Sequence, residues 1–175
     1  MIGFDSSYMI YIFLPTLLIS LGVQLYLRST YAKWSKVRNS NNLTGEQVAQ
    51  VLFDRTSLAE IQTAVIPGDM TDHFDPRTNI VRFSQGTATQ PSVAAMAIAA
   101  HELGHVQQYQ SGSALIKARN FLVPALQFSP TISYISILIG LLLNITGLIW
   151  VGIAFFSLMV FFTILTLPVE FDASR

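Results

Sequence analysis

The sequence predicts a mainly α-helical, multi-pass membrane protein with an N-terminal span, a small cytoplasmic α+β segment and a C-terminal transmembrane hairpin. Of its 175 residues 51% are hydrophobic and only 11% are charged, which is too apolar for a soluble globule of this size. The charged residues are confined to 1–5, 28–119 and 170–175, so two long uncharged stretches separate them. Ten basic residues balance ten acidic ones without clustering, so no nucleic-acid partner is indicated.

The two uncharged stretches have the lengths of membrane spans. Residues 6–27 match one transmembrane helix of about 20 residues, and without a basic leader or a small-residue cleavage site they predict an uncleaved anchor. Residues 120–169 are long enough for two spans and a turn. The segment Asn144-Ile-Thr-Gly147 is the best break, and it leaves expected spans at 121–143 and 148–167.

The basic residues beside these stretches predict the orientation. They follow the first span and precede the second, at Arg28, Lys33, Lys36, Arg38, Lys117 and Arg119. By the positive-inside rule residues 28–120 face the cytoplasm, and after two more spans residues 168–175 return to that side, where we expect another helix to begin. The bilayer is therefore one expected partner.

The polar segment is expected to contain both helices and strands. A capping box at 44–47 predicts a helix to about residue 52, and strands are expected at 61–66 and 79–84. The second strand could be an edge that receives an extended peptide. A helix is expected over 92–110, since Pro91-Ser92 suits its start and Ser111-Gly112 its end.

The helix expected at 92–110 contains His101-Glu-Leu-Gly-His105. Helical residues four apart share a face, so His101 and His105 can point a ring nitrogen at one ion, and the chain has no cysteine that could replace them. Glu102 lies close enough to act as a general base without being a ligand. The pattern predicts a zincin-like Zn²⁺ site at which Glu102 takes a proton from an activated water.

A catalytic zinc site takes three protein ligands, and the third is not obvious from the sequence. A third histidine six residues after His105 is excluded, because Ser111 stands there. Glu170 is the preferred candidate because it follows the uncharged hairpin, directly after Pro168, on the side of the histidines. Alternatively, Glu170, Asp172 and Arg175 are only the polar flank of a span. The other candidate ligands are Asp69, Asp72, His73 and Asp75.

Several further residues have two interpretations each. His73 is an electrophile near the scissile carbonyl, an extra ligand that occupies the open zinc position in a resting state, or a turn residue between Asp72 and the Asp75-Pro76 break. Three arginines could stabilise an oxyanion, although salt bridges are the commoner use of such residues: Arg77, Arg82 and Arg175.

Four motifs together carry a family resemblance. Asp72-His-Phe-Asp-Pro-Arg77, Val81-Arg-Phe-Ser84, Ala99-Ala-His-Glu-Leu-Gly-His105 and Pro168-Val-Glu-Phe-Asp-Ala-Ser-Arg175 resemble the bacterial neutral zinc metallopeptidases of the YugP type. The resemblance implies a multi-pass peptidase of the bacterial cytoplasmic membrane, with zinc on His101, His105 and Glu170 and with Glu102 as catalyst. Proteins of this type usually continue further, so we expect residues, and another span, after Arg175.

A more distant resemblance links the chain to the HtpX and CAAX-protease gluzincins, which have a later E-F-x-A-D motif. This chain has Glu170-Phe-Asp-Ala-Ser174, with its acid at the second position after Glu170 rather than the fourth. Whether Asp172 supports a metal ligand is therefore open.

The expected function is that of a membrane-anchored zinc endopeptidase, whose partner is a peptide or protein segment near the membrane. Two alternatives share its motif. One is a catalytically silent metal-binding scaffold or regulator, and the other is a zinc hydrolase of non-peptide amides.

Overall fold

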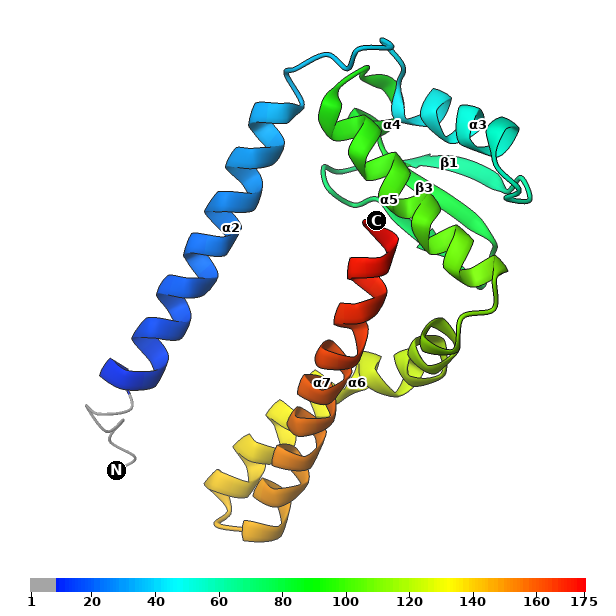
Figure 1. The fold of residues 1–175 in the computed structure, drawn as a ribbon. Helices are drawn as coiled ribbons and strands as arrows, with labels where there is room; N and C mark the ends of the chain where they lie inside the picture. The colour runs from blue at the N-terminus through cyan, green and yellow to red at the C-terminus, as the bar shows by residue number, and fades with distance from the viewer. Residues whose placement is uncertain (1–8) are drawn as a thin grey trace.

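The computed structural model describes residues 9–175 and is mainly helical, with one small sheet, as predicted. A π-helical turn, η1 (Met9–Phe13), leads into the long helix α2 (Leu14–Trp34). An α/β part follows, and then come α6 (Ala114–Leu142) and α7 (Thr146–Ala173). Figure 1 shows that α2, α6 and α7 all extend from the same side of the α/β part, while the C-terminal end of α7 returns to it.

The sheet of the described residues has the order β1-β3-β2. β1 (Gln62–Ile66) runs parallel to β3 (Ile80–Ser84), and β2 (His73–Asp75) pairs antiparallel with β3. The two predicted strands are confirmed, but the prediction that residues 79–84 form an edge is wrong, because β3 has a neighbour on each side. The short strand β2, which the sequence did not predict, forms an edge of this sheet.

Three helices complete the α/β part: α3 (Gly45–Arg55), α4 (Gln85–Thr89) and α5 (Val93–Gln110). The capping box at Thr44 and Gln47 is present, and the Ser92 hydroxyl accepts the Ala95 N–H at 3.1 Å, so both predicted helix starts are confirmed. The buried core joins α3, α4, α5 and β3 through Val48, Ala49, Phe53, Ile61, Val81, Phe83, Ala88, Ala99, Leu103 and Val106.

α6 and α7 form a tight antiparallel hairpin, and the predicted break between them is confirmed. Asn144 turns the chain with φ +52°, and the Ile145 N–H donates to the Gly140 carbonyl at 2.8 Å. The Ser133 hydroxyl donates to the Gly152 carbonyl at 2.8 Å, so the two helices approach closely at this point. In the described part of the chain, α7 is the one helix long and apolar enough to cross a membrane, and α6 contains a shorter apolar segment, Leu126–Leu142.

α7 extends past one expected helix boundary, and the described residues cover only part of the first expected span. The prediction that a new helix begins at 168 is wrong, because α7 continues through Pro168 and ends at Ala173. Glu170 therefore lies in the last turn of α7. The expected N-terminal span, 6–27, overlaps η1 and α2, but residues 6–8 lie outside the described residues.

Candidate metal centre and catalytic site

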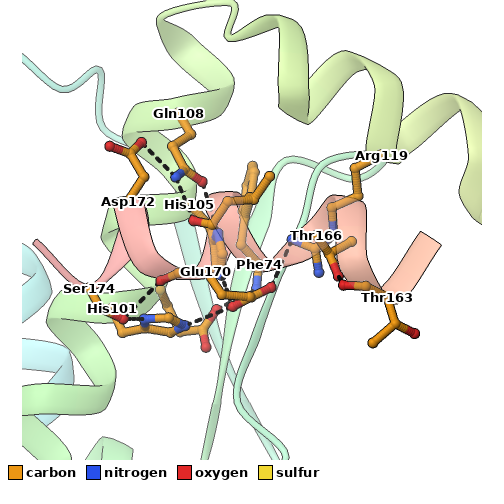
Figure 2. A network of polar contacts seen from close by, with 12 residues as sticks. Phe74, His101, His105, Gln108, Arg119, Thr163, Thr166, Glu170, Asp172 and Ser174 are labelled. Carbon is orange, nitrogen blue, oxygen red and sulfur yellow. Dashed lines mark hydrogen bonds and ion pairs between the residues drawn. The ribbon is translucent and has the colours of Figure 1, made fainter. Parts of the chain in front are cut away.

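Two helices far apart in sequence bring three candidate ligands together (Figure 2). α5 supplies His101 and His105 on one face, one turn apart, and the last turn of α7 supplies Glu170. Glu170 Oε2 lies 3.4 Å from His101 Nε2 and 3.3 Å from His105 Nε2. One ligand atom from each residue can be chosen so that all three lie within 4.8 Å of one another.

α7 reaches this position because Gly104 has no side chain. The Ala173 backbone lies against Gly104, and a Cβ built there would be 2.9 Å from Ala173 Cα and 3.0 Å from its carbonyl carbon. Val169 and Ala173 are both buried, so the end of α7 packs tightly on the histidine helix. The glycine within the motif therefore sets the spacing between the two helices.

Each histidine ring is held by its second nitrogen. His101 Nδ1 lies 3.0 Å from Ser174 Oγ, and His105 Nδ1 lies 3.1 Å from Gln108 Oε1. In both rings Nε2 is the atom beside Glu170 (Figure 2). The orientation suits a metal that binds both Nε2 atoms.

Glu102 lies next to the candidate ligands but points at β2. It is 7% exposed, and its Oε2 accepts the backbone N–H of Phe74 at 3.0 Å. Burial raises the pKa of Glu102, against the opposing effects of His105, of His101 and of the Phe74 hydrogen bond. A raised carboxyl pKa brings a general base closer to the pH at which it must exchange protons.

A cavity of about 700 Å³ contains this group. Its wall includes the three candidate ligands, Glu102 and the β2 region from Asp72 to Arg77. α6 closes the other side with Ile116, Arg119 and Gln127. Residues of the predicted membrane hairpin and of the α/β part thus line one cavity.

The second oxygen of Glu170 has a partner of its own. Arg119 Nη1 lies 3.5 Å from Glu170 Oε1, while Oε2 faces the histidines. The ion pair is partly exposed, so its main effect is to orient the carboxylate rather than to stabilise the fold.

Comparison with known proteins agrees with this geometry. The model of a family described as "Putative neutral zinc metallopeptidase" matches residues 8–175. The chain belongs to this family. It is also 36% identical over 168 residues to the protein called "Putative membrane protease YugP" of Bacillus subtilis (strain 168), a match that covers 95% of this chain and 75% of that relative. No solved structure is significantly similar to the chain.

The three candidate ligands fit the zinc ion of this metallopeptidase family. Two ligand atoms that each lie about 2.1 Å from a tetrahedral zinc are about 3.4 Å apart. The two Nε2 to Oε2 distances, 3.4 and 3.3 Å, match that spacing, and the whole group lies within 4.8 Å. Two imidazoles and one carboxylate are also a donor set typical of catalytic zinc in peptidases.

Two of the other carboxylates that the sequence offered as third ligands are engaged elsewhere. Asp72 accepts the backbone N–H of Ser84 at 2.7 Å and its hydroxyl at 3.0 Å. Asp75 accepts hydrogen bonds from Thr78 and Arg82, each at 2.8 Å. Within residues 9–175, the metal group that includes the motif histidines contains neither of them, nor Asp69.

His73 lies in β2 and lines the cavity beside the candidate ligands, but it is not part of the metal group of the described residues. Its Nδ1 is 2.8 Å from the Thr71 carbonyl, which can only accept, so Nδ1 carries the hydrogen. The prediction that His73 is a turn residue is wrong, because the strand includes it. The role of an electrophile remains a hypothesis.

Asp172 and Arg175 lie near Glu170 in sequence, but neither belongs to the metal group of the described residues. Asp172 accepts a hydrogen bond from Gln108 at 2.8 Å, so it contacts a partner of His105 rather than the metal group. Arg175 lines a second cavity, of about 800 Å³, together with Asp172 and Ser174.

Of the arginines considered from the sequence, Arg82 forms the expected salt bridge, with Asp75.

Four contacts of this site were not predicted from the sequence: those of Phe74, Gln108, Arg119 and Ser174. Two of them had a usable signal. Gln108 is one helical turn after His105, and Ser174 stands at the fourth position after Glu170, where the related motif has its acid. Arg119 was considered only as a flanking charge, because nothing local to it indicates that α6 passes over the site.

Proposed function

We propose that this chain is a membrane-anchored zinc metallopeptidase that hydrolyses peptide bonds at the cytoplasmic face of the bacterial membrane. The observation that carries the proposal is the convergence of His101, His105 and Glu170 beside the buried Glu102, in a chain of a zinc metallopeptidase family. Its substrate is a peptide or protein segment close to the membrane.

The residues divide the work of hydrolysis. His101, His105 and Glu170 hold the zinc ion, which when bound supplies the Lewis acidity that activates water and polarises a carbonyl. Glu102 accepts the proton of the attacking water and returns it to the leaving amine. The Phe74 N–H, 3.0 Å from its carboxylate, keeps Glu102 aimed into the cavity.

An extended substrate would lie along β2 rather than β3. The Phe74 N–H reaches Glu102, so this edge of β2 faces α5 and the cavity instead of β3. Because the Phe74 N–H is bonded to Glu102, this edge would offer a substrate its remaining backbone groups, and such hydrogen bonds select an extended chain with little regard to its side chains. A flexible or unfolded segment is therefore the favoured substrate.

The membrane arrangement is part of the proposal. Spans at 6–27, 121–143 and 148–167 would place residues 28–120 and the end of α7 in the cytoplasm. Three observations support this arrangement: the length and apolarity of α7, the apolar second half of α6, and the name of the Bacillus relative, which calls it a membrane protease. Gln127, inside the second expected span, lines the cavity, so the site would lie at the membrane surface.

The metal site is tested by measuring zinc content and peptide cleavage of the full chain in detergent. We expect Glu170→Ala to lose both zinc and activity, because only two imidazoles would remain to hold the ion. Glu60→Ala is the matched control, since Glu60 is an exposed carboxylate outside the site, and it should behave as wild type. Unchanged zinc affinity in Glu170→Ala would remove Glu170 from the ligand set.

Topology has a separate test, because the chain contains no cysteine. Single variants Ser40→Cys and Ile145→Cys should react with an impermeant maleimide from opposite sides of the membrane. Labelling of both from one side would refute the hairpin and the proposed location of the site.

A further inference from the structure

We propose that Ser174 and Gln108 are positioning residues that fix the tautomers of His101 and His105, so that each Nε2 is free for the metal. The inference rests on the proposed zinc site and adds the two neutral groups that orient it. Both lie beside the histidine rings and both also bond to the backbone of α7, as Figure 2 shows.

The hydroxyl of Ser174 decides the tautomer of His101. Ser174 Oγ lies 3.0 Å from the Glu170 carbonyl oxygen and 3.0 Å from His101 Nδ1. A hydroxyl has one hydrogen, and here it points to the Glu170 carbonyl, which can only accept and which also receives the Ser174 N–H at 3.2 Å. In this arrangement Ser174 Oγ accepts from His101, whose Nδ1 carries the proton.

The amide of Gln108 decides the tautomer of His105 in the same way. Its Nε2 donates both hydrogens, to the Val169 carbonyl at 2.8 Å and to Asp172 Oδ2 at 2.8 Å. A flipped amide would set its oxygen against these two acceptors and would lose both hydrogen bonds of a side chain that is only 6% exposed. The Oε1 atom, 3.1 Å from His105 Nδ1, therefore accepts that proton.

The same two residues couple the tautomers to the position of the third ligand. Ser174 bonds to the carbonyl of Glu170, and Gln108 bonds to the carbonyl of Val169 directly before it. A displacement of the end of α7 would release both rings and the carboxylate together. The three ligands are thus oriented as one unit.

Because these partners are neutral, the proposal predicts one substitution that strengthens zinc binding as well as others that weaken it. Zinc-binding histidines often donate their second N–H to a carboxylate, which makes the ring more basic than a neutral acceptor does. Ser174 is a neutral acceptor at the position where the distantly related E-F-x-A-D motif has an acid. Ser174→Asp should therefore bind zinc at least as tightly as wild type, a result that a merely structural serine would not give.

The tautomers can be read without any metal. The chain has three histidines, so imidazole ¹⁵N NMR of the metal-free protein in detergent, at about pH 8.5, is readily assigned. We expect Nδ1–H in His101 and His105 of the wild type. Ser174→Ala should change the signals of His101, and Gln108→Leu those of His105. A ring with hydrogen on Nε2 and none on Nδ1, in either wild-type histidine, overturns the proposal.

Zinc affinity supplies the second readout. Ser174→Ala and Gln108→Leu should each weaken zinc binding about 10- to 100-fold, and Ser174→Thr, which keeps the hydroxyl, should restore it. Ser29→Ala, an exposed serine of α2, is the control. Wild-type affinity in folded Ser174→Ala overturns the proposal for His101. Failure of the wild type to bind zinc would instead overturn the proposed function, while the metal-free spectra still test the tautomers.

Discussion

Gly104→Ala tests how the two halves of the site are held together. The glycine lies on the face of α5 that meets α7, where the Ala173 backbone takes the space of a side chain. The added methyl would meet the Ala173 carbonyl oxygen, Cα at 2.9 Å and carbonyl carbon at 3.0 Å. These are backbone atoms in a helix, so they cannot rotate aside and α7 must move.

The size of that movement follows from van der Waals contact. Non-bonded carbons prefer at least about 3.5 Å, so the end of α7 must shift by at least about 0.6 Å relative to α5. Zinc ligand distances tolerate only about 0.2 Å. Glu170 lies three residues before Ala173, so the shift should carry its carboxylate out of the range of a shared ion.

Competition with a chromophoric chelator measures the result. Gly104→Ala should weaken zinc binding by at least about 100-fold, the upper range for loss of a supporting contact, and lower stability by about 1–3 kcal/mol through overpacking. Gly147→Ala is the matched control, since a Cβ there meets nothing within 4 Å. A folded Gly104→Ala with wild-type zinc affinity would show that the close approach of α7 does not set the site.

Further predictions concern stability in detergent. Thr44→Ala should cost about 1 kcal/mol by removing the cap of α3, and an unchanged melting temperature would contradict that role. Gly152→Val should destabilise the hairpin, because even a Cβ there would lie 2.8 Å from the Ser133 carbonyl oxygen, and unaltered unfolding would disprove this packing. Thr78 and then Arg82 hold the pKa of Asp75 below its usual range, so the stability it adds is complete above about pH 4 and is lost as pH falls further. Asp75→Asn should remove this pH-dependent contribution to the free energy of unfolding, which is below about 1 kcal/mol. If wild type and Asp75→Asn lost stability equally as pH falls, this role of Asp75 would be contradicted.

Most helices of this fold were predictable because they have local signals, although the short helix α4 was not predicted. Thr44 with Gln47, and Ser92 with Pro91, are caps that act within a few residues, and the Asn144 turn separates two uncharged runs. β2 and the central position of β3 were not predictable. Both depend on which strands pair across the chain, and a three-residue strand such as His73–Asp75 has no periodicity to detect.

The candidate site likewise contains residues that local spacing predicts and residues that depend on tertiary packing. His101, Glu102 and His105 lie on one helix, so their spacing alone predicted their grouping. Glu170 reaches the histidines only because the α6–α7 hairpin returns the chain to them. In the sequence, the charge pattern was the only support for that return. Arg119 and the Phe74 N–H reach the site through tertiary packing, which leaves no pattern within the sequence.

The most direct test of the central claim compares the wild type with Glu102→Gln, each reconstituted with zinc and assayed for cleavage of one unfolded peptide. Because Glu102 is outside the metal group of the described residues, both proteins should bind one zinc per chain with similar affinity. The cleavage rate should fall by about 10²- to 10⁴-fold in Glu102→Gln, as expected for loss of a general base. Cleavage at the wild-type rate by zinc-loaded Glu102→Gln would contradict the account.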